Sequence, residues 1–492
     1  MMQNLAYGFS LVFKPFTFAL MVFGTAIGVV IGALPGLTAS MGIILLLPLI
    51  YRLPASVSLV MLCGLFCGGM YGGSISGILL NTPGTPSASA TTLDGYPLNR
   101  QGKAGKALGI ATIASFGGGI ISTACLIVIA PQLAKVALSF QAADYFSLSI
   151  FGLSIMASSS GKNVVKGLIA GCVGLLASCV GIDTIVGVNR LTFNNMYLAG
   201  GFSLLPVLIG VFAVSEVLKQ VQTSHEERPV TIQAVTDILP TWKEVKGVIP
   251  AILVGGVLGV FIGIVPGTGG AIACFLAYNV VQKFAKDRDQ FGQGALSGIA
   301  APESANNATT GGALIPMLCL GVPGDVVTSV MLGALVLIGV RPGPLLFIEN
   351  IDVVYSIFAG MVIIQFLMLG FGLLSSRYSP AILRIPDTLL MPVIMVLCVV
   401  GAFCLNNSLY DVTVALVFGI LGFFMKRWGY PGAPLVLGVI LGPMAEENLN
   451  RALLVSNNNW AVLVQRPISL TFLLLSALSI GLAVYNVKKK EA

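Results

Sequence analysis

The sequence predicts an all-α fold, that of a polytopic helical membrane protein with two internal repeats, discontinuous helices and re-entrant segments. Three observations lead to this prediction. Hydrophobic residues make up 56% of the chain and charged residues only 9%, whereas soluble domains carry roughly 25% charged residues. Several long stretches carry no charge at all. One motif with a Pro-Gly break in its middle also occurs twice, once in each half of the chain.

The charge-free stretches cover residues 15–51, 53–93 and 247–282. Because about 20 apolar residues cross a bilayer core, each stretch is long enough for two crossings or for one crossing and a re-entrant piece. The alternation of polar and apolar side chains that marks a membrane β-barrel is missing from the sequence. The N-terminus lacks the basic region and cleavage site of a signal peptide. We therefore expect its first hydrophobic segment to be kept as a helix.

The repeated motif reads GVVIGALPGLT at 28–38 and GVFIGIVPGTG at 259–269. A second break follows each copy, NTPG at 81–84 and GVPG at 321–324. Two similar halves whose apolar segments break at matching positions indicate the core of a secondary transporter. An ancient duplication with merely structural glycines is the alternative. Inverted repeats are expected, because they are the commoner arrangement around midplane sites, although the spacing also fits parallel repeats.

The order of apolar segments divides the chain into four parts. The first repeat is expected at 1–218 and the second at 247–466, joined by a polar linker at 219–246. Residues 467–492 are expected to form a C-terminal transmembrane helix with a basic tail. The apolar runs at 37–51 and 271–282 are short for a full crossing and are expected to be re-entrant. In chain order, the apolar runs lie at 17–34, 37–51, 55–80, 107–131, 145–158, 163–186, 200–218, 247–266, 271–282, 325–340, 352–373, 388–404, 409–425, 432–443 and 467–486.

The breaks expose backbone groups that a helix normally hides. Proline removes a donor and ends a helix, and glycine permits the turn that follows. In hydrocarbon this freed backbone must face protein or a watery cavity. Freed carbonyl groups can hold Na⁺, and N–H groups at the N-terminus of a half-helix can hold a carboxylate. Hydroxyl and amide side chains beside the breaks strengthen this interpretation: Thr38, Ser40, Asn81, Thr82, Thr85, Ser87, Thr268, Thr328 and Ser329.

The most polar passage of the second half is GIAAPESANNATTGG at 298–312. On a helix Glu303 and Asn307 share a face, with Asn306 beside them. An ionisable side chain at membrane depth indicates function by default, because burying it unpaired is costly. We therefore expect Glu303 in a coupling or substrate site. The alternative is a cap on the helix that Pro302 opens, or a place at the membrane interface.

Two further acidic residues follow breaks. Asp325 comes directly after Pro323-Gly324 and has the same ambiguity, since an acid in the first turn of a helix also compensates the helix dipole. Asp94 lies in TLDGYP, within the polar and turn-rich passage at 81–106. We expect Asp94 in a turn, as a structural residue or at most a hinge.

Other classes of function find little support. The only histidine is His225, which excludes histidine-based metal sites and triads, and no P-loop motif occurs. All nine cysteines fall in apolar segments and are expected to be buried. The net charge of +7 indicates positive-inside loops and not nucleic-acid binding. We expect no enzyme, no cofactor and no metal apart from transported Na⁺. An ion or anion channel is the remaining rival, because broken helices also build selectivity filters.

The sequence resembles the large membrane subunit of the tripartite tricarboxylate transporters. The resemblance rests on GALPGLTASMG at 32–42, YGGSISGILLNTPGTPSASATTLDGYPL at 71–98, APESANNATTGGALIPMLCLGVPG at 301–324 and RPGPLLF at 341–347. It covers the chain in order and implies an ion-driven importer of organic carboxylates in the bacterial inner membrane, with an elevator-like core. It also implies two partners, a small membrane subunit and a periplasmic solute-binding protein. The motifs do not identify the carboxylate.

Together these points give a hypothesis for the site. Substrate carboxylates are expected at Asn81, Thr82, Pro83, Gly84, Thr85, Val322, Pro323, Gly324, Asp325 and Thr328. Cations are expected at Gly36, Thr38, Gly267, Thr268, Glu303, Asn306 and Asn307. The coupling ion is Na⁺ or H⁺: Glu303 permits protons, whereas the amides and freed carbonyl groups favour sodium.

Overall fold

The structure is a computed structural model that describes residues 2–158, 164–183, 187–223, 238–383 and 387–491. It forms two compact units, the first from Met1–Ala134 and Thr223–Leu390 and the second from Lys135–Gln222 and Met391–Ala492. Each unit therefore takes one segment from each half of the chain. His225 and the centre of the expected linker lie outside the described residues.

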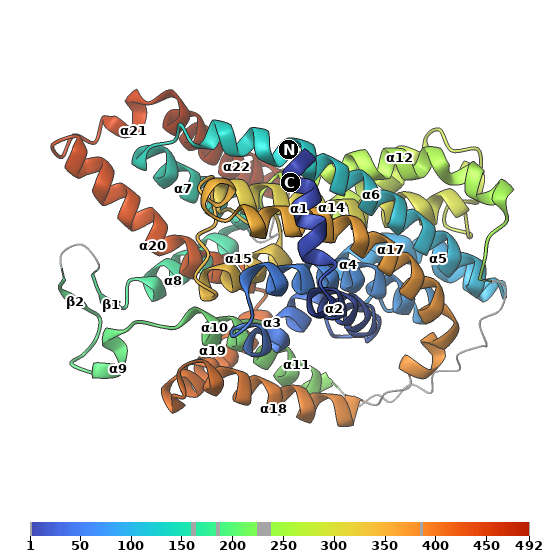
Figure 1. Ribbon diagram of the computed structural model, residues 1–492, viewed down its shortest axis with the longest axis horizontal. Helices are drawn as coiled ribbons and strands as arrows, with labels where there is room; N and C mark the ends of the chain where they lie inside the picture. The colour runs from blue at the N-terminus through green and yellow to red at the C-terminus, as the bar shows by residue number, and fades with distance from the viewer. Residues whose placement is uncertain (1, 159–163, 184–186, 224–237, 384–386, 492) are drawn as a thin grey trace. The chain divides into compact units, whose positions relative to one another are not determined.

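The first unit begins with helices from the N-terminal half (Figure 1). They are α1 (Met2–Val12), α2 (Pro15–Ala33), α3 (Ala39–Ile50), α4 (Ala55–Leu80), the short 3-10 helix η1 (Pro86–Ala88), α5 (Ser89–Arg100) and α6 (Ala104–Ala137), whose last residues belong to the second unit. The helices α2 and α4 confirm the apolar runs expected at 17–34 and 55–80. The α3 helix has 12 residues and spans only about 18 Å, which is short for a bilayer crossing.

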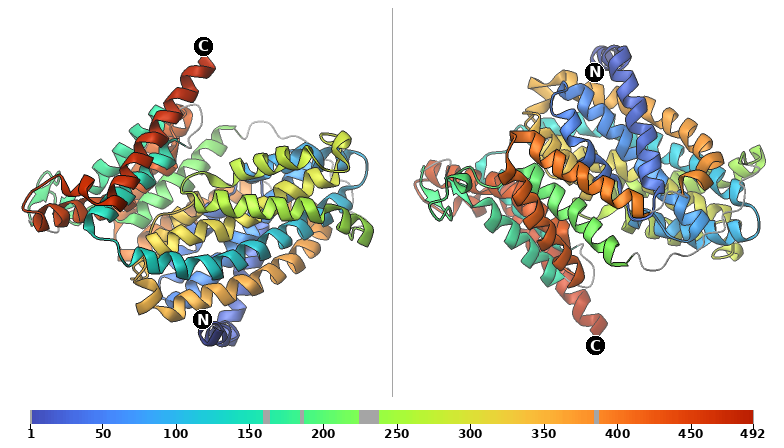
Figure 2. Two further views of the ribbon diagram at one scale, coloured as in Figure 1. Left: turned by 90° about the horizontal axis from the view of Figure 1, so that it is seen from above. Right: turned by 90° about the horizontal axis from the view of Figure 1, so that it is seen from below.

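The C-terminal half adds a similar series to the same unit. It comprises α12 (Trp242–Ile264), α13 (Gly269–Gln282), η3 (Arg288–Gln290), α14 (Leu296–Leu320), α15 (Val326–Leu337), α16 (Leu346–Glu349) and α17 (Ile351–Ile382). Both α13 and α15 are short, with 14 and 12 residues. The helices α6, α12 and α14 run side by side in this unit (Figure 2), and glycines and serines lie at their contacts.

Small residues let the paired helices approach closely. In α2, Gly24, Gly28 and Gly32 lie against the backbone of α4, and a Cβ on any of them would overlap an α4 carbonyl oxygen. The same spacing recurs in α12, whose Gly255 and Gly259 pack on the backbone of α14. Glycine at every fourth position is the usual means of close helix packing in membranes. The pairs α2–α4 and α12–α14 are thus built in the same way.

Where the structure describes it, the second unit is also helical, apart from one small hairpin. Its elements are α7 (Ala142–Ser158), α8 (Val164–Ser178), the paired strands β1 (Gly181–Ile182) and β2 (Asn189–Arg190), α9 (Met196–Ala199), α10 (Leu204–Leu208), the π-helix η2 (Ile209–Val214), α11 (Ser215–Thr223), α18 (Asp387–Asn406), α19 (Leu409–Arg427), α20 (Gly432–Val455), α21 (Val462–Gln465) and α22 (Pro467–Glu491).

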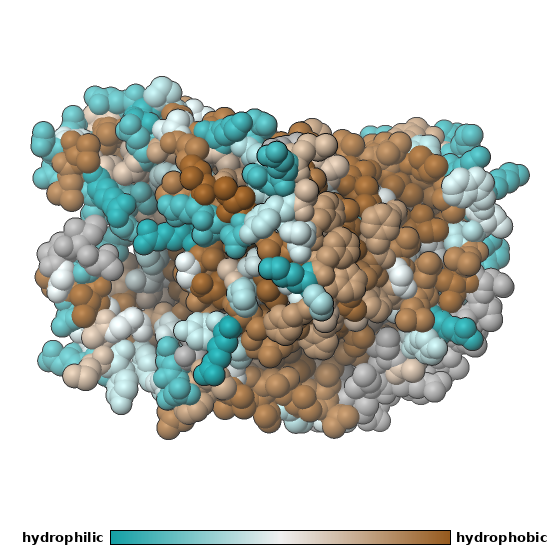
Figure 3. Space-filling view, viewed as in Figure 1, coloured by the Kyte–Doolittle hydropathy of each residue, from teal (hydrophilic) through white to brown (hydrophobic). Residues whose placement is uncertain are grey.

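Seven helices among the described residues are long and apolar enough to cross a membrane: Pro15–Ala33, Ala55–Leu80, Ala104–Ala137, Leu204–Gln222, Trp242–Ile264, Ile351–Ser379 and Leu409–Arg427. Hydrophobic side chains also cover the outer surface over α2 and α17 (Figure 3), where Phe16, Phe23 and Phe366 are exposed. The chain is therefore a multi-pass membrane protein with an all-α fold, as predicted.

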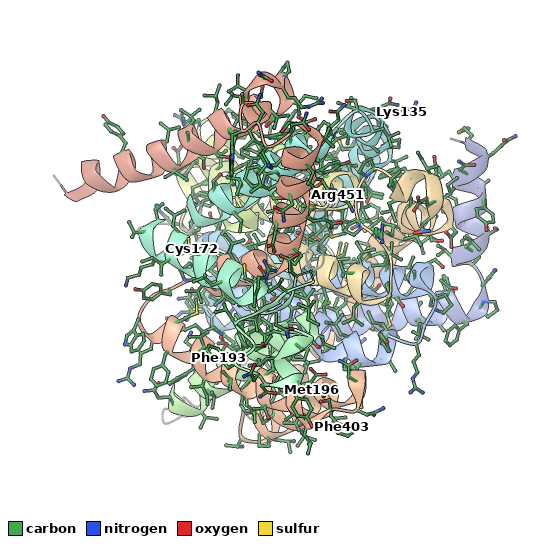
Figure 4. The ribbon with its side chains drawn as sticks, turned by 90° about the vertical axis from the view of Figure 1, so that its left-hand side faces the viewer. Lys135, Cys172, Phe193, Met196, Phe403 and Arg451 are labelled. Atoms are coloured by element: carbon green, nitrogen blue, oxygen red, sulfur yellow. The ribbon has the colours of Figure 1, made fainter. Side chains whose placement is uncertain are left out.

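Two expectations are wrong. The passage 81–106 was expected to be turn-rich, but most of it is helical, in η1, α5 and the start of α6. The cysteines were expected to be buried, but Cys172, which Figure 4 labels in the second unit, and Cys404 are exposed. Both lie on apolar helices, and a small apolar side chain is as compatible with lipid as with a protein interior.

Candidate functional site

The two breaks of the N-terminal half lie against each other. After α2 the chain turns at Gly36 with φ +84°, and after α4 it turns at Asn81 with φ +58°. The second break then packs onto the end of α2, so closely that a Cβ on Gly84 would overlap the carbonyl oxygen of Gly32. The Gly84 N–H donates to the carbonyl oxygen of Gly73 at 3.0 Å. Glycine is required at position 84 for this approach.

The breaks of the C-terminal half meet in a corresponding way. The turns are Gly267, with φ +77°, and Gly321, with φ +70°. The Gly267 N–H donates to the carbonyl oxygen of Gly324 at 2.8 Å. A Cβ on Gly324 would lie 2.7 Å from the carbonyl oxygen of Gly263, so the second break again sits on the end of the first broken helix.

The two pairs of breaks also converge within the first unit. Gly270, which follows the third break, lies beside Ser87, which follows the second: a Cβ on Gly270 would be 3.1 Å from the Ser87 Cβ and 3.3 Å from the Thr309 hydroxyl. The α3 helix, which follows the first break, packs on α15, which follows the fourth. The structure therefore brings together four broken segments that are far apart in the sequence.

The residues expected to bind substrate differ in exposure. Residues 81–83 are exposed, whereas residues 322–324 are buried. Beyond the exposed turn, Thr85 is buried and its hydroxyl lies 3.1 Å from the Ser87 hydroxyl. The break at 81–85 is thus accessible at residues 81–83, with buried hydroxyl groups behind them, while its counterpart at 322–324 is enclosed.

Asp325 and Thr328 form a capping box at the start of α15. The Thr328 N–H donates to Asp325 Oδ1 at 2.7 Å, and the Asp325 N–H donates to the Thr328 hydroxyl at 2.9 Å. Of the two interpretations of Asp325, the structure shows the dipole-compensating one. A carboxylate at this helix end repels a second carboxylate, which makes the side chains of Asp325 and Thr328 poor ligands for an anion.

Two threonines expected near cations, Thr38 and Thr268, already form hydrogen bonds with the backbone. Thr38 caps α3, accepting from the Met41 N–H at 3.4 Å. The Thr268 hydroxyl is within 2.6 Å of the Ile262 carbonyl oxygen and 2.9 Å of the Val265 carbonyl oxygen. One hydroxyl proton thus serves carbonyl groups that the third break frees, so part of the freed backbone is already satisfied.

Glu303 lies in the middle of α14, fully buried. Its Oε1 accepts hydrogen bonds from the hydroxyls of Ser74 and Thr91, the latter at 2.5 Å, and its Oε2 accepts from the hydroxyl of Ser115 at 2.8 Å. The interpretation of Glu303 as a helix cap is therefore wrong, because α14 begins at Leu296, two turns earlier. A buried carboxylate held only by neutral hydroxyls is a natural site for a proton or a cation.

The neighbouring amides face different surroundings. Asn306 donates from Nδ2 to the Met70 carbonyl oxygen at 2.9 Å, and Thr309, beside Gly270, donates to the Asn306 carbonyl oxygen. Asn306 is thus close to the third break. Among the described residues, the Asn306 Oδ1 and both amide atoms of Asn307 are buried without a hydrogen-bond partner.

Asp94 has a different setting from the one expected. It lies inside α5, fully buried, and not in a turn. Its carboxylate accepts from the Tyr278 hydroxyl at 2.9 Å and from the N–H groups of Gly294 and Ala295, both at 2.8 Å. Asp94 therefore ties the N-terminal half to the segment before α14, which agrees with a structural role.

The side chains that surround the buried polar residues of α14 could not be identified from the sequence. Ser74, Thr91 and Ser115 are unremarkable in sequence, and Gln365 lies in the apolar run of α17. A buried carboxylate needs donors, so Glu303 did signal that hydroxyls had to be near. It did not say which ones, because they come from α4, α5 and α6.

The second unit also contains two similar segments, PVLIGV at 206–211 and PLVLGVI at 434–440, and an acidic residue follows each, Glu216 and Glu446. Glu216 pairs with Lys426 at 2.6 Å. Glu446 pairs with Arg190 of β2, which also lies 3.2 Å from Asp183. These carboxylates are engaged in ion pairs.

Comparison with known proteins gives a consistent result. Residues 18–437 match the family described as the tripartite tricarboxylate transporter TctA family. The chain is 36% identical over 483 residues, 98% of this chain and 95% of the relative, to an uncharacterized 52.8 kDa protein of the TAR-I ttuC' 3' region of Agrobacterium vitis. It is 37% identical over 226 residues, 46% of this chain and 93% of the relative, to an uncharacterized protein of the TAR-II ttuC' 3' region of the same organism. No solved structure matches.

Proposed function

The chain belongs to the tripartite tricarboxylate transporter TctA family, and from this we propose that it is an ion-gradient-driven importer of organic di- or tricarboxylates in the bacterial inner membrane. Family membership implies tricarboxylate transport as part of a tripartite system. We propose that a periplasmic solute-binding protein delivers the substrate and that a small membrane subunit accompanies this chain. The observation that carries the proposal is the convergence of four helix breaks in one unit.

The accessible break at 81–85 is the proposed contact for the substrate carboxylate. It has an amide and hydroxyls, and no side chain caps the helical segment η1 that starts there. Unlike α15, this segment has no acidic cap that would repel an anion. The backbone of residues 322–324 is proposed to complete the site from the other half.

The cations are proposed to bind near Gly36, Gly267 and Asn306, with Glu303 holding a proton or adding negative charge. The matched pairs α2–α4 and α12–α14 support two internal repeats, since the glycine contacts and both turns recur in each pair. An inverted arrangement and an elevator-like movement remain part of the proposal. They follow from the family resemblance and from the usual architecture of carriers with broken helices.

The proposal is tested by reconstituting the chain with its small membrane subunit in liposomes and adding the loaded binding protein. A carrier gives saturable uptake of labelled carboxylate that needs the binding protein and an ion gradient. Collapsing the Na⁺ and H⁺ gradients separately identifies the coupling ion. Passive single-channel currents from the purified chain, without any need for the binding protein, would show a channel and contradict the proposal.

A further inference from the structure

A second polar cluster lies on α14, one turn from Glu303. It consists of Cys67 of α4, Asn307 and Thr310 of α14, and Gln365 of α17, and we call it the amide cluster. Gln365 Nε2 donates to Cys67 Sγ at 3.6 Å, and Cys67 Sγ lies 3.7 Å from the Thr310 hydroxyl. That hydroxyl donates to the backbone carbonyl oxygen of Asn307 at 2.7 Å. The contacts join Cys67, Thr310 and Gln365, and Asn307 lies one turn before Thr310 on α14.

Three amide atoms of this cluster have no partner. All four side chains are fully buried. Within the described part of the chain, Asn307 Oδ1, Asn307 Nδ2 and Gln365 Oε1 accept or donate no hydrogen bond. Native proteins leave few buried polar groups unsatisfied, and each such group calls for an explanation. Two of the three atoms are carbonyl oxygens, which accept and cannot donate. The cluster therefore has more unmet acceptors than donors.

The α6 helix leaves room for the amide group of Gln365 because residue 119 is glycine. A Cβ on Gly119 would overlap Gln365 Oε1. One turn before Gly119 on the same helix, Ser115 donates to Glu303. Gln365 thus reaches into the space between α4, α6 and α14 only because residue 119 has no side chain.

The electrostatics of the unit favour a cation at this place. Glu303 precedes Asn307 by four residues and shares its face of α14, at a rise of about 6 Å. No lysine or arginine is buried among the described residues, so the Glu303 carboxylate has no positive side chain beside it in the interior. An unpaired buried charge is costly, and a cation bound one turn away would reduce that cost.

We propose that the amide cluster binds a sodium ion, with Asn307 Oδ1 and Gln365 Oε1 as ligands. Neutral amide oxygens suit a hard monovalent cation, whereas calcium and magnesium are usually held by carboxylates in the first coordination sphere. Asn306 belongs elsewhere: it is about 100° from Asn307 around the helix and hydrogen-bonds toward Met70. The expected cation residues thus divide into one group at the breaks and one at the amide cluster.

The proposed ion is a coupling ion only if the transport proposal holds, but its binding is measurable alone. The purified chain in detergent, without carboxylate or partner subunits, is heated in increasing NaCl, with choline chloride holding the ionic strength constant. A ligand that binds the folded state raises the melting temperature as its concentration rises. We expect NaCl to raise it and KCl at equal concentration to raise it less.

Variants assign this response to the cluster. Asn307→Ala and Gln365→Met are expected to weaken the apparent Na⁺ affinity at least about tenfold, the ratio that corresponds to one lost ligand contact. Methionine has a similar length and flexibility to glutamine, so Gln365→Met keeps the packing. Asn99→Ala is the matched control, because the Asn99 amide donates to the carbonyl oxygens of Ile78 and Leu79 and lies outside the cluster. It should keep the full Na⁺ response.

The outcomes separate this inference from the transport proposal. Equal melting temperatures in sodium and choline, an equal effect of potassium, or a full Na⁺ response in both cluster variants would each overturn the sodium site. Proton-driven uptake by a chain with no Na⁺ response would leave the transport proposal standing without the site. A Na⁺ response that the cluster variants abolish, in a chain that transports no carboxylate, would support the site and refute the carrier.

Discussion

Replacing Glu303 distinguishes a structural carboxylate from one that binds the coupling ion. In Glu303→Gln the amide oxygen can still accept from Ser74 and Thr91, which bond to Oε1. The amide nitrogen replaces Oε2 and can donate to the hydroxyl of Ser115, which rotates to accept. Each of the three hydroxyls thus keeps one hydrogen bond to residue 303. The free energy of unfolding should therefore change by less than about 1 kcal/mol.

In Glu303→Ala the same neighbours lose their acceptor. Three hydroxyls that donate to a fully buried carboxylate are left without it, and the side chain leaves a cavity. Large-to-small substitutions in a core cost about 2–5 kcal/mol, and lost hydrogen bonds to the carboxylate place this variant in the upper part of that range. Thermal unfolding of the purified chain in detergent compares both variants with Ser115→Ala, which removes one donor to the carboxylate and should cost about 1.5–3 kcal/mol.

Transport provides the second readout for the same variants. Glu303→Gln cannot ionise, so we expect it to fold normally and to lose gradient-driven uptake. If Glu303→Gln unfolds as readily as Glu303→Ala, the carboxylate is structural. If it folds normally and takes up substrate at the wild-type rate under the same gradient, Glu303 has no part in coupling, and this reasoning is refuted.

Three further substitutions test individual contacts. Gly84→Ala introduces a Cβ that overlaps the Gly32 carbonyl oxygen, so it should lower stability by about 1–3 kcal/mol and reduce uptake. Gly370→Ala, which meets no atom within 4 Å, should do neither. Asp94→Ala removes the acceptor of the Tyr278 hydroxyl and of the N–H groups of Gly294 and Ala295, which should cost about 1–3 kcal/mol in thermal unfolding without changing the Na⁺ response. An equally stable Asp94→Ala would contradict the role of Asp94 as a link between α5 and the segment before α14. Thr268→Val keeps the shape but removes the hydroxyl from the carbonyl oxygens of Ile262 and Val265, which keep the N–H groups of Val265 and Thr268 as donors. It should cost about 1 kcal/mol, and unchanged stability would show that the hydroxyl contacts do not stabilise the third break.

The sequence was most informative where hydrophobicity alone decides the structure. The run at 55–80 coincides with α4, and the Pro-Gly breaks follow the ends of α2 and α12. It was least informative at 89–100, where polar residues suggested turns. There the α5 helix depends on partners distant in sequence: Asp94 is satisfied by Tyr278 and by backbone N–H groups at 294–295. Local composition does not contain that information.

The candidate site was predictable in part for the same reason. The four breaks could be found from Pro-Gly and their convergence suspected from the repeat, but which breaks touch depends on helix packing. Asp325 had two interpretations in the sequence, and the hydrogen bonds with Thr328 show the capping one. The position of the Gln365 amide depends on Gly119 of a third helix. A single sequence gives no sign that Gln365 and Gly119 meet.

The central claim is that the accessible break at 81–85 meets the substrate carboxylate. Its most direct test is the initial rate of uptake at a saturating concentration of loaded binding protein, for Asn81→Ala and Thr82→Ala. Losing one hydrogen bond to a charged group costs about 1.5–3 kcal/mol, so the rate should fall about tenfold or more. Thr92→Ala is the matched control, because the Thr92 hydroxyl bonds to the Ser89 carbonyl oxygen within α5, and it should transport normally. Wild-type rates in both Asn81→Ala and Thr82→Ala, at normal expression, would contradict the claim.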